Sequence, residues 1–276
     1  MGGVFLPDPF QQFKDFETLM GLPYGIVSKV LVKGWVDGPW GRMMTGQMTV
    51  PEFARVFCQL LSKEINREIQ EDTVVAFMSS YGNAQAYPEM LAAARSVRAE
   101  GLRTALLTNN CYLDEGRTRT LLPLERSLFD VVVESCVLGY CKPDRRVYNE
   151  CLHRLDVTPD QTIFLDDQTD NVEVARSIGI TSIKVNSPSQ AVAELSRILD
   201  IPLNYQPSCT DTNPIMSNWG SELVMDAKTA ASKLACSENS NNLSIEKSEL
   251  TQSYTEAAIS PKKAKQSQGS SGKNCS

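Results

Sequence analysis

Three groups of polar side chains follow short apolar runs in this sequence, and their residue types suit phosphate and metal chemistry. Thr108 and Asn109 close the run that begins at residue 103, and their hydroxyl and amide groups can donate hydrogen bonds to phosphoryl oxygens. Lys142 offers a positive charge for the same anion. Asp166 and Asp167 end another apolar run, and two adjacent carboxylates repel each other unless a cation such as Mg²⁺, which prefers oxygen ligands, lies between them.

Each group also has an ordinary structural explanation. The sequence Thr-Asn-Asn is common turn chemistry, and a lysine usually lies on the surface. One aspartate after a strand often caps the following helix, although a second aspartate there fits that explanation less well. The functional interpretation therefore depends on finding all three groups in one chain.

Residues 88–200 alternate between helical and strand periodicity. Helices are predicted for 88–101, 144–156, 171–180 and 188–200, and strands for 103–108, 129–135, 162–167 and 181–185. Gly101 is expected to end its helix in the left-handed conformation, and Asp144 is expected to cap the helix that follows it. Strands that alternate with helices predict an α/β fold with a parallel sheet, which places the polar groups at the carboxyl edge where such folds bind ligands.

Residues 10–87 show helical patterns without a clear strand. Thr49 and Glu52 form a capping box at the start of the best helix, which continues to about residue 68. We interpret 10–87 as a helical cap above the sheet edge, 88–204 as the α/β core and 205–276 as a disordered tail. Residues 1–9 form a short segment before the cap, which a family resemblance described below explains. The stretch 207–276 has 14 serines and 11 Leu, Ile, Val, Met and Trp residues combined, too few apolar groups to offset the entropy of ordering.

Composition excludes several classes of protein. A net charge of −6 argues against nucleic acid or an anionic membrane surface as the main partner, and no apolar run approaches the roughly 18 residues of a membrane span. The first ten residues lack the pattern of a secretory signal, so the cytoplasm is the default expectation, with mitochondria or peroxisomes left open. The oligomeric state is not determined.

The cysteines and the single histidine give no catalytic signal. None of the eight cysteines forms a CxxC pair, and we expect reduced, partly buried thiols. His153 is the one histidine of the chain, which argues against a Ser-His-Asp mechanism and a His-rich metal site. No G-x-G-x-x-G follows a predicted strand, so a nicotinamide-binding enzyme is a remote alternative.

In the order Thr-Asn, Lys-Pro-Asp and Phe-Leu-Asp-Asp, the three groups resemble the second, third and fourth motifs of the haloacid dehalogenase (HAD) superfamily. The stretches 131–152 and 163–195 are similar to the phosphatase-like N-terminal domain of acyl-CoA dehydrogenase family member ten. A further similarity is to the N-terminal phosphatase domain of soluble epoxide hydrolase. The resemblance covers about residues 1–204 and stops at the tail.

The resemblance implies Mg²⁺-dependent hydrolysis of a small phosphorylated substrate through an aspartyl-phosphate. Thr108 and Asn109 would hold the phosphoryl group, and Lys142 would neutralise charge between nucleophile and phosphate. Asp167 would bind Mg²⁺ with support from Asp166 or Asn171. Lipid-like phosphates are conceivable by analogy with the epoxide hydrolase domain.

The family's first motif is an apolar strand that ends in a nucleophilic aspartate, and residues 1–9 resemble only a remnant of it, without that aspartate. Met1 aligns with the residue after the nucleophile, and Gly2 falls where a second aspartate commonly lies. Asp8 and Asp15 follow no predicted strand. We therefore expect impaired hydrolysis, with two alternatives: a binding module without turnover, or residual hydrolysis by direct attack of water.

The same alignment has a structural consequence. The first-motif strand would lie between 103–108 and 162–167, so its absence predicts a gap of roughly 10 Å in the sheet. Each unpaired buried backbone group costs about 1–3 kcal/mol. We expect a poorly stable chain unless the core closes or a partner supplies a strand.

Two further sets of residues carry weaker predictions. Near the mouth of the cap, either substrate contacts or simple packing would explain four residues, namely Trp35, Trp40, Arg42 and Met44. In the tail, 221–235 could form a transient helix, and the basic cluster 261–265 resembles a weak nuclear-import signal that is more simply a solvated charge run.

Overall fold

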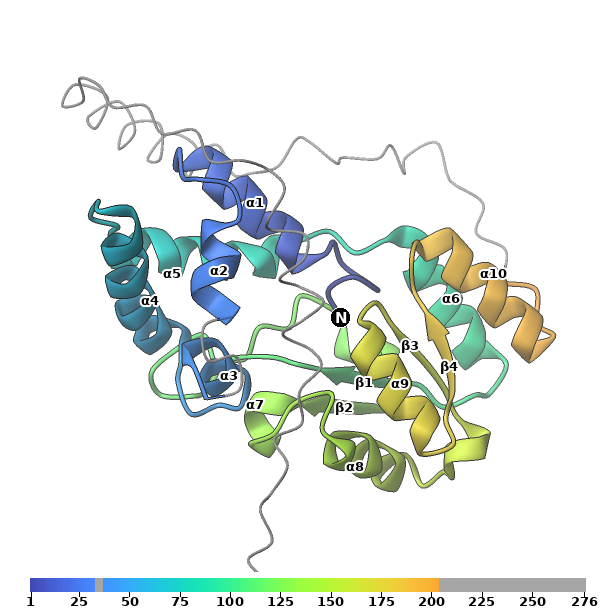
Figure 1. The fold of residues 1–276 in the computed structure, drawn as a ribbon. Coiled ribbons are helices and arrows are strands. Elements are labelled where there is room, and N and C mark those ends of the chain that lie inside the picture. The colour runs from blue at the N-terminus through green and yellow to red at the C-terminus, as the bar shows by residue number, and fades with distance from the viewer. Residues whose placement is uncertain (33–36, 204–276) are drawn as a thin grey trace, which may run out of the picture. The chain divides into compact units, whose positions relative to one another are not determined.

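The computed structural model describes residues 1–32 and 37–203, which form a helical part followed by an α/β part (Figure 1). Trp35 and the two predicted tail features lie outside the described residues, as do Cys209, Cys236 and Cys275. Within the described residues, no helix has the length and apolar character needed to cross a bilayer. The five described cysteines are free, as expected, and His153 lies exposed on a helix.

Helices form the first part, as the sequence predicts. Its helices are α1 (Pro9–Leu19), α2 (Ile26–Val32), α3 (Pro39–Met44), α4 (Val50–Ile65) and α5 (Glu71–Ser80), followed by the 3₁₀ turn η1 (Tyr81–Asn83). The predicted capping box is confirmed, because Glu52 N donates to Thr49 Oγ1 at 3.4 Å and Thr49 N donates to the Glu52 carboxylate at 2.7 Å. Helix α4 packs against α2, α3 and α5 around a shared apolar core.

The α/β part contains the predicted helices and strands. They are α6 (Pro88–Ala99), β1 (Ala105–Thr108), η2 (Arg126–Leu128), β2 (Val131–Glu134), α7 (Ser135–Leu138), α8 (Arg145–Leu155), η3 (Pro159–Gln161), β3 (Ile163–Asp166), α9 (Thr169–Ser177), β4 (Thr181–Lys184) and α10 (Pro188–Leu199). Gly101 has the expected positive φ of 78°, and the Asp144 carboxylate accepts the N–H of Arg146 at 2.9 Å. Both predicted helix boundaries are confirmed.

The four strands form two separate parallel pairs. Leu106 lies opposite Val132 in β1 and β2, and Phe164 lies opposite Ser182 in β3 and β4. In the described part of the chain, β1 and β3 are not hydrogen-bonded to each other. The parallel α/β fold is therefore present with the interruption that the sequence predicts, although Leu107 of β1 and Phe164 of β3 pack against one apolar cluster.

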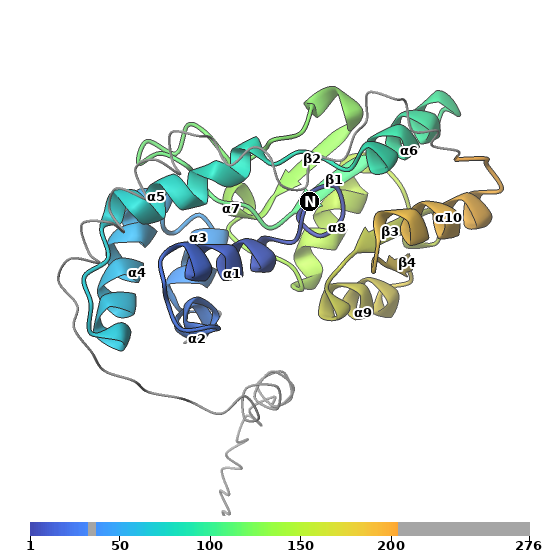
Figure 2. The same ribbon diagram turned by 90° about the horizontal axis from the view of Figure 1, so that it is seen from above.

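Each strand pair has buried and partly buried apolar residues. Val133 in β2 and Ile183 in β4 are both 0% exposed, and Leu106 in β1 is 4% exposed. On the strands that flank the interruption, Leu107 and Leu165 are only partly buried. Helix α8 packs on β1 and β2, whereas α9 packs on β3 and β4 (Figure 2), and the two helices also contact each other in a shared apolar cluster.

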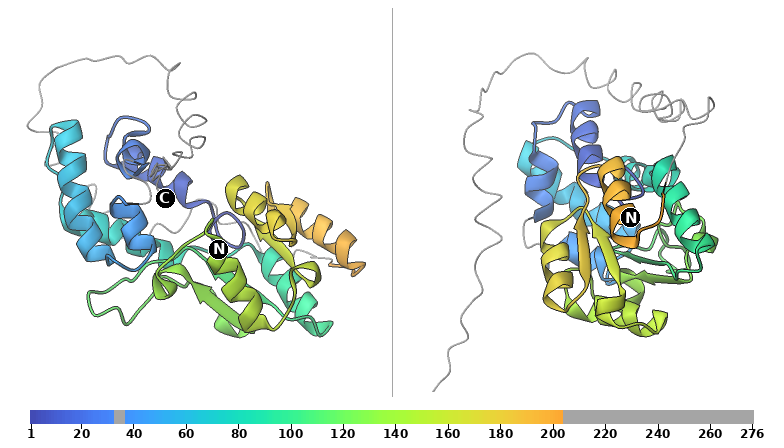
Figure 3. Two further views of the ribbon diagram at one scale, coloured as in Figure 1. Left: turned by 60° about the horizontal axis from the view of Figure 1, so that its bottom comes forward. Right: turned by 90° about the vertical axis from the view of Figure 1, so that its right-hand side faces the viewer.

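The remaining helices tie the α/β part together at its far side. Helix α10 packs against both β4 and α6, and Figure 3 shows α6 and α10 side by side. Their shared apolar cluster includes Met90 and Ala93 of α6 together with Ala191 and Val192 of α10. This contact connects the chain before β1 to the chain after β4, and so it holds the two strand pairs within one fold.

Candidate functional site

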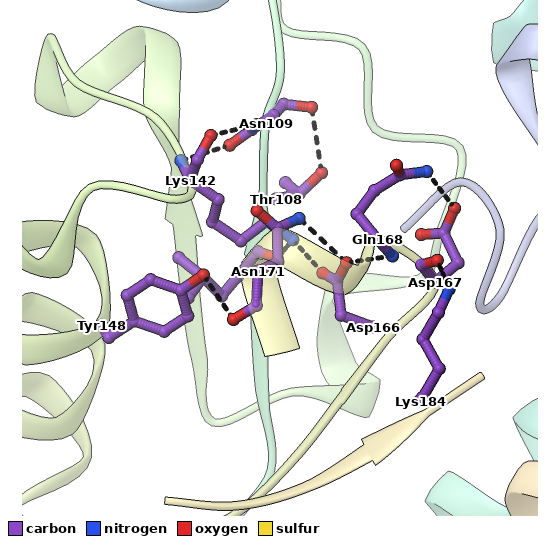
Figure 4. Close-up of polar contacts among 10 residues, drawn as sticks. Thr108, Asn109, Lys142, Tyr148, Asp166, Asp167, Gln168, Asn171 and Lys184 are labelled. Atoms are coloured by element: carbon purple, nitrogen blue, oxygen red, sulfur yellow. Dashed lines mark hydrogen bonds and ion pairs between the residues drawn. The ribbon is translucent and has the colours of Figure 1, made fainter. Parts of the chain in front are cut away.

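The predicted site residues meet at the carboxyl ends of β1 and β3 (Figure 4). Thr108 is the last residue of β1, and Asp166 is the last residue of β3. Lys142 comes from the loop between α7 and α8, and Asn171 lies in the first turn of α9. The polar residues that the sequence identified are thus brought to one place by three connections, namely those after β1, between α7 and α8, and between β3 and α9.

A buried ion pair forms the centre of the cluster. Lys142 Nζ lies 2.7 Å from Asp166 Oδ2, and the two residues are 7% and 2% exposed. The same ammonium group donates to the main-chain oxygen of Leu107 at 3.1 Å. Lys142 therefore bridges the two strand pairs, joining the backbone of β1 to the side chain of β3.

Asp166 is surrounded by donors. Its Oδ1 atom accepts the main-chain N–H of Gln168 at 2.8 Å and the Asn171 amide N–H at 2.9 Å. Burial disfavours the charged form, but the charge of Lys142 and the hydrogen bonds from Lys142, Asn171 and Gln168 outweigh it, so the pKa of Asp166 lies below its ordinary value. Asp166 is a fixed carboxylate.

Asp167 is in the opposite electrostatic situation. Burial and the neighbouring Asp166 charge raise the pKa of its carboxyl group above the ordinary value. Its Oδ2 atom accepts the side-chain amide of Gln168 at 2.7 Å, and Lys184 donates to its main-chain oxygen rather than to its carboxylate. A Cβ atom at Gly3 would overlap the Asp167 carboxylate, so the backbone of Gly3 lies directly against this carboxylate. Among the described side chains, no lysine, arginine or histidine forms an ion pair with the Asp167 carboxylate, and the main-chain ammonium group of Met1 lowers its pKa only in part.

The loop after β1 is held by Lys142 and by α7. Lys142 N donates to Asn109 Oδ1 at 2.8 Å, and Asn109 Nδ2 donates back to Lys142 O at 3.0 Å. The Thr108 hydroxyl donates to the main-chain oxygen of Asn109 at 3.2 Å. Asn110 Nδ2 donates to Glu134 at 2.8 Å, and Glu134 also pairs with Arg126. Asn109 thus orders the backbone of the lysine loop.

An apolar cavity of about 90 Å³ adjoins this loop. Asn109 and Asn110 line it from the α/β part. The helical part contributes mainly apolar side chains, among them Phe13, Trp40, Met44, Phe77, Met78 and Tyr81. Trp40 and Met44, which were predicted at a cap mouth, line this cavity and also pack against the core, and a contact with substrate stays a prediction. Arg42 is exposed and does not line the cavity.

A larger cavity lies elsewhere. It measures about 460 Å³ and is lined by the segment 82–86, by α6 and by the segment 123–128. None of the predicted site residues lines it. If cavity volume alone were used to choose the functional site, it would indicate this cavity and not the place where the ionisable side chains meet.

Three residues near the site were not predicted. Gln168 contacts both aspartates, Lys184 contacts Asp167, and Tyr148 donates from its buried hydroxyl to Asn171 O at 3.0 Å. Lys184 ends β4, so the carboxyl-edge rule that selected the aspartates would also have selected it. Tyr148 gives no such signal, because its spacing along the predicted helix indicates only a residue that packs in the hydrophobic core.

Comparison with known proteins identifies the family. The family signature described as "Hydrolase: haloacid dehalogenase-like hydrolase" matches residues 33–179, more than half of the chain. The chain belongs to the haloacid dehalogenase-like hydrolases. The match contains Thr108, Lys142, Asp166, Asp167 and Asn171, and the resemblance stated from the sequence motifs is confirmed at the level of the family.

Two relatives of this HAD-like chain are much longer proteins. It is 40% identical over 214 residues to acyl-CoA dehydrogenase family member 10 of Mus musculus, covering 78% of the chain and 20% of that relative. It is 29% identical over 222 residues to bifunctional epoxide hydrolase 2 of Sus scrofa, covering 77% of the chain and 40% of that relative. The chain thus spans less than half of the length of either protein.

A solved structure confirms the fold. A predicted HAD-like family hydrolase from Porphyromonas gingivalis is similar with a TM-score of 0.54 and 21% sequence identity. The similarity covers 72% of this chain and 94% of that structure.

Proposed function

We propose that this HAD-like chain binds small phosphomonoesters together with Mg²⁺ and hydrolyses them slowly or not at all. One observation carries the proposal: the buried Lys142 ammonium group lies 2.7 Å from Asp166, and Lys142 is hydrogen-bonded to Asn109, which lines an apolar cavity. This arrangement offers a fixed positive charge to an anion and an apolar space to the group attached to it.

The phosphate end would be held by Lys142 and Thr108. The Thr108 hydroxyl is a rotatable donor that now bonds to a neighbouring carbonyl, so it can turn toward a phosphoryl oxygen without a backbone change. Both ends of the Asn109 amide are bonded to Lys142, so its proposed contribution is to hold the lysine in place, and a direct contact of Asn109 with phosphate stays a prediction.

The residues present fit Mg²⁺ by donor chemistry. The described residues contain no cluster of three His, Cys, Asp or Glu side chains that could hold a metal ion. At this site the two carboxylates are those of Asp166 and Asp167. The raised pKa of Asp167 reports a carboxylate that a nearby cation would stabilise. The Asn171 amide nitrogen faces Asp166, which leaves its oxygen as a third hard ligand. When bound, Mg²⁺ would supply charge stabilisation for phosphoryl oxygens.

The cavity suggests the class of substrate. Its helical wall is aromatic and aliphatic, and its volume of about 90 Å³ suits a short apolar group better than a polyhydroxylated sugar. We therefore propose a phosphomonoester with a small apolar body. Longer lipid-like phosphates would require the wall to move.

Slow turnover follows from the state of the carboxylates. Asp166 is held by Lys142, Asn171 and Gln168, and Asp167 is assigned to the cation, so neither is free to attack phosphorus. Asp8, the acidic residue of the segment 1–9, caps α1 by accepting the N–H of Phe10 at 2.9 Å. A non-catalytic phosphate-binding module is the second candidate, and it shares all the binding predictions.

Binding and turnover can be measured separately. Calorimetry with benzylphosphonate, which cannot be hydrolysed, should show saturable binding that strengthens with Mg²⁺, and release of phosphate from phenyl phosphate should be slow. Lys142→Met should weaken benzylphosphonate binding about tenfold or more, because a charge-assisted contact is lost. Lys29→Met is the control, since Lys29 lies in an exposed ion pair with Glu64 in the helical part.

The outcomes are distinct. Failure of benzylphosphonate to bind with and without Mg²⁺ would refute the proposed site. Rapid hydrolysis of phenyl phosphate would refute slow turnover and would require a different attacking group. Binding with no measurable hydrolysis would select the non-catalytic alternative.

A further inference from the structure

The hydroxyl group of Ser135 connects two sides of the apolar cavity. Ser135 is the first residue of α7 and is 2% exposed. Its Oγ atom donates to the main-chain oxygen of Met44 at 2.5 Å and accepts the main-chain N–H of Asn110 at 2.8 Å. Met44 lines the cavity from the helical part, and Asn110 lines it from the loop after β1. One oxygen atom therefore fixes the spacing between these two backbones.

Each backbone group has a reason to need this hydroxyl. Met44 ends α3, where a helix leaves carbonyl groups without partners in the helix itself. Asn110 is held on its own side by its amide, which bonds to Glu134 and accepts the N–H of Cys111. Without the hydroxyl, a buried carbonyl and a buried N–H would both lose a partner.

The turn after α3 and the start of α7 form a junction that is tightly packed. Gly46 follows α3 with a φ of 71°, and a Cβ atom there would overlap the main-chain oxygen of Cys136. The turn after α3 therefore rests directly on the start of α7. A shift of either element would change the distance between the helical wall of the cavity and the loop after β1.

Other side-chain contacts between the two parts are more exposed. Arg117 donates to Gly46 O at 3.2 Å, and Arg55 pairs with Glu115 at 3.0 Å, with all three charged side chains well exposed. Exposed ion pairs contribute about 0–1 kcal/mol and hold geometry loosely. Ser135 makes the buried polar side-chain contact at this junction, alongside the main-chain bond from Val50 N to Tyr112 O at 2.8 Å.

We propose that Ser135 is a positioning residue that sets the separation of the helical wall from the Asn109–Asn110 loop, and thereby selects the apolar body of the ligand. The inference rests on the proposed function, because it assigns the apolar body to this cavity. Ser135 has no hydrogen bond to Lys142, Asp166 or Asp167. Both ends of the Asn109 amide stay bonded to Lys142 without Ser135. Loss of the Ser135 hydroxyl should therefore displace the helical wall more than the phosphate end.

The test compares two ligands on one variant. With Mg²⁺ present, Ser135→Ala should weaken benzylphosphonate binding about tenfold, the equivalent of one lost hydrogen bond to a fixed wall. Inorganic phosphate, which has no apolar body, should bind within about twofold of the unaltered chain. The ratio of the two dissociation constants is the readout, because a general loss of folded protein would affect both ligands equally.

Two further variants sharpen the result. Ser182→Ala is the matched control, since Ser182 is also buried and its hydroxyl donates to Ile180 O at 3.1 Å, inside the β3–β4 pair. It should leave the ratio unchanged. Gly46→Ala perturbs the same junction from the helical side and should change the ratio as Ser135→Ala does. Should Ser135→Ala not fold, Ser135→Cys keeps the size and weakens the donor, and it should change the ratio in the same direction.

The possible failures can be told apart. If the unaltered chain binds neither ligand, the proposed function itself fails and this inference with it. If the unaltered chain binds both and the junction variants lose both ligands equally, or lose neither, Ser135 is structural and the inference is overturned.

Discussion

At the scale of single residues, the ion pair of Lys142 and Asp166 decides most of the site's electrostatics. Removing two charges from water is costly, and the pair compensates only because each partner has further hydrogen bonds. Lys142 also bonds to Leu107 O, and Asp166 also bonds to Asn171 and Gln168. Loss of one partner would leave the other charge buried and unmatched.

Lys142→Met should therefore lower the free energy of unfolding by about 3–5 kcal/mol at neutral pH, whereas Lys29→Met should lower it by less than about 1 kcal/mol. Both lysines pair with a carboxylate, at 2.7 Å and 2.5 Å, but Lys142 is buried and the Lys29 side chain is 61% exposed. Urea denaturation of the two variants measures the difference. Equal losses would show that burial of the pair has no energetic weight.

The pH dependence has a defined sign. In the unaltered chain the pKa of Asp166 is lowered, so its contribution to stability is present above the ordinary value of about 3.9 and is lost as the pH falls through the lowered pKa. Without Lys142, burial dominates and should raise that pKa. The variant should then lose stability as the pH rises through the raised value. The stability difference between the two chains should be small in acid and should grow toward neutral pH.

At the scale of elements, the capping box of α4 is the clearest case in which local sequence fixes a helix boundary. Thr49→Ala should lower the free energy of unfolding by about 1 kcal/mol, because Glu52 N would lose its acceptor. Thr18→Ala in α1 is the control. Thr18 is exposed and bonds back to Lys14 O, so alanine there should be neutral or slightly stabilising. Thermal unfolding of both variants tests this, and equal destabilisation would contradict a specific capping effect.

Periodicity located the helices and strands of the α/β part, but it overestimated strand length. The run 103–108 reads as one strand, whereas β1 begins at Ala105. Arg103 is instead bound to Leu155 O at the end of α8, and Thr104 N donates to the Asp130 carboxylate at 2.8 Å. Similarly, Ser135 leaves the predicted strand to start α7. Long-range partners set these ends, and local sequence does not contain them.

The same distinction applies to the site. Motif order and the carboxyl-edge rule were enough to bring together Thr108, Lys142 and Asp166. The rule could also have found Lys184, which ends a strand. Tyr148 and Ser135 could not be found in this way, because their importance comes from contacts with backbone atoms of segments distant in sequence.

At the scale of the whole molecule, the interrupted sheet is the dominant feature. Strands β1 and β3 are parallel to their own partners, yet they are connected to each other at their carboxyl ends through Lys142. The inward strands keep partly buried apolar side chains, Leu107 and Leu165 among them. An incoming strand parallel to both could therefore pair on its two sides and cover apolar surface at the same time.

Extending the chain at its N-terminus with a short Val/Ile strand that ends in aspartate should raise the free energy of unfolding by about 3 kcal/mol or more. A four-residue strand between two edges gains several hydrogen bonds at about 1 kcal/mol each, and in a chain of this size the melting temperature should rise by roughly 6 °C or more. Hydrogen exchange should slow at the amides of β1 and β3 in particular. An extension of the same length with proline at alternate positions cannot pair and serves as the control. If both extensions leave the melting temperature unchanged, the unpaired edges of β1 and β3 do not limit stability, and the division of the sheet has another cause.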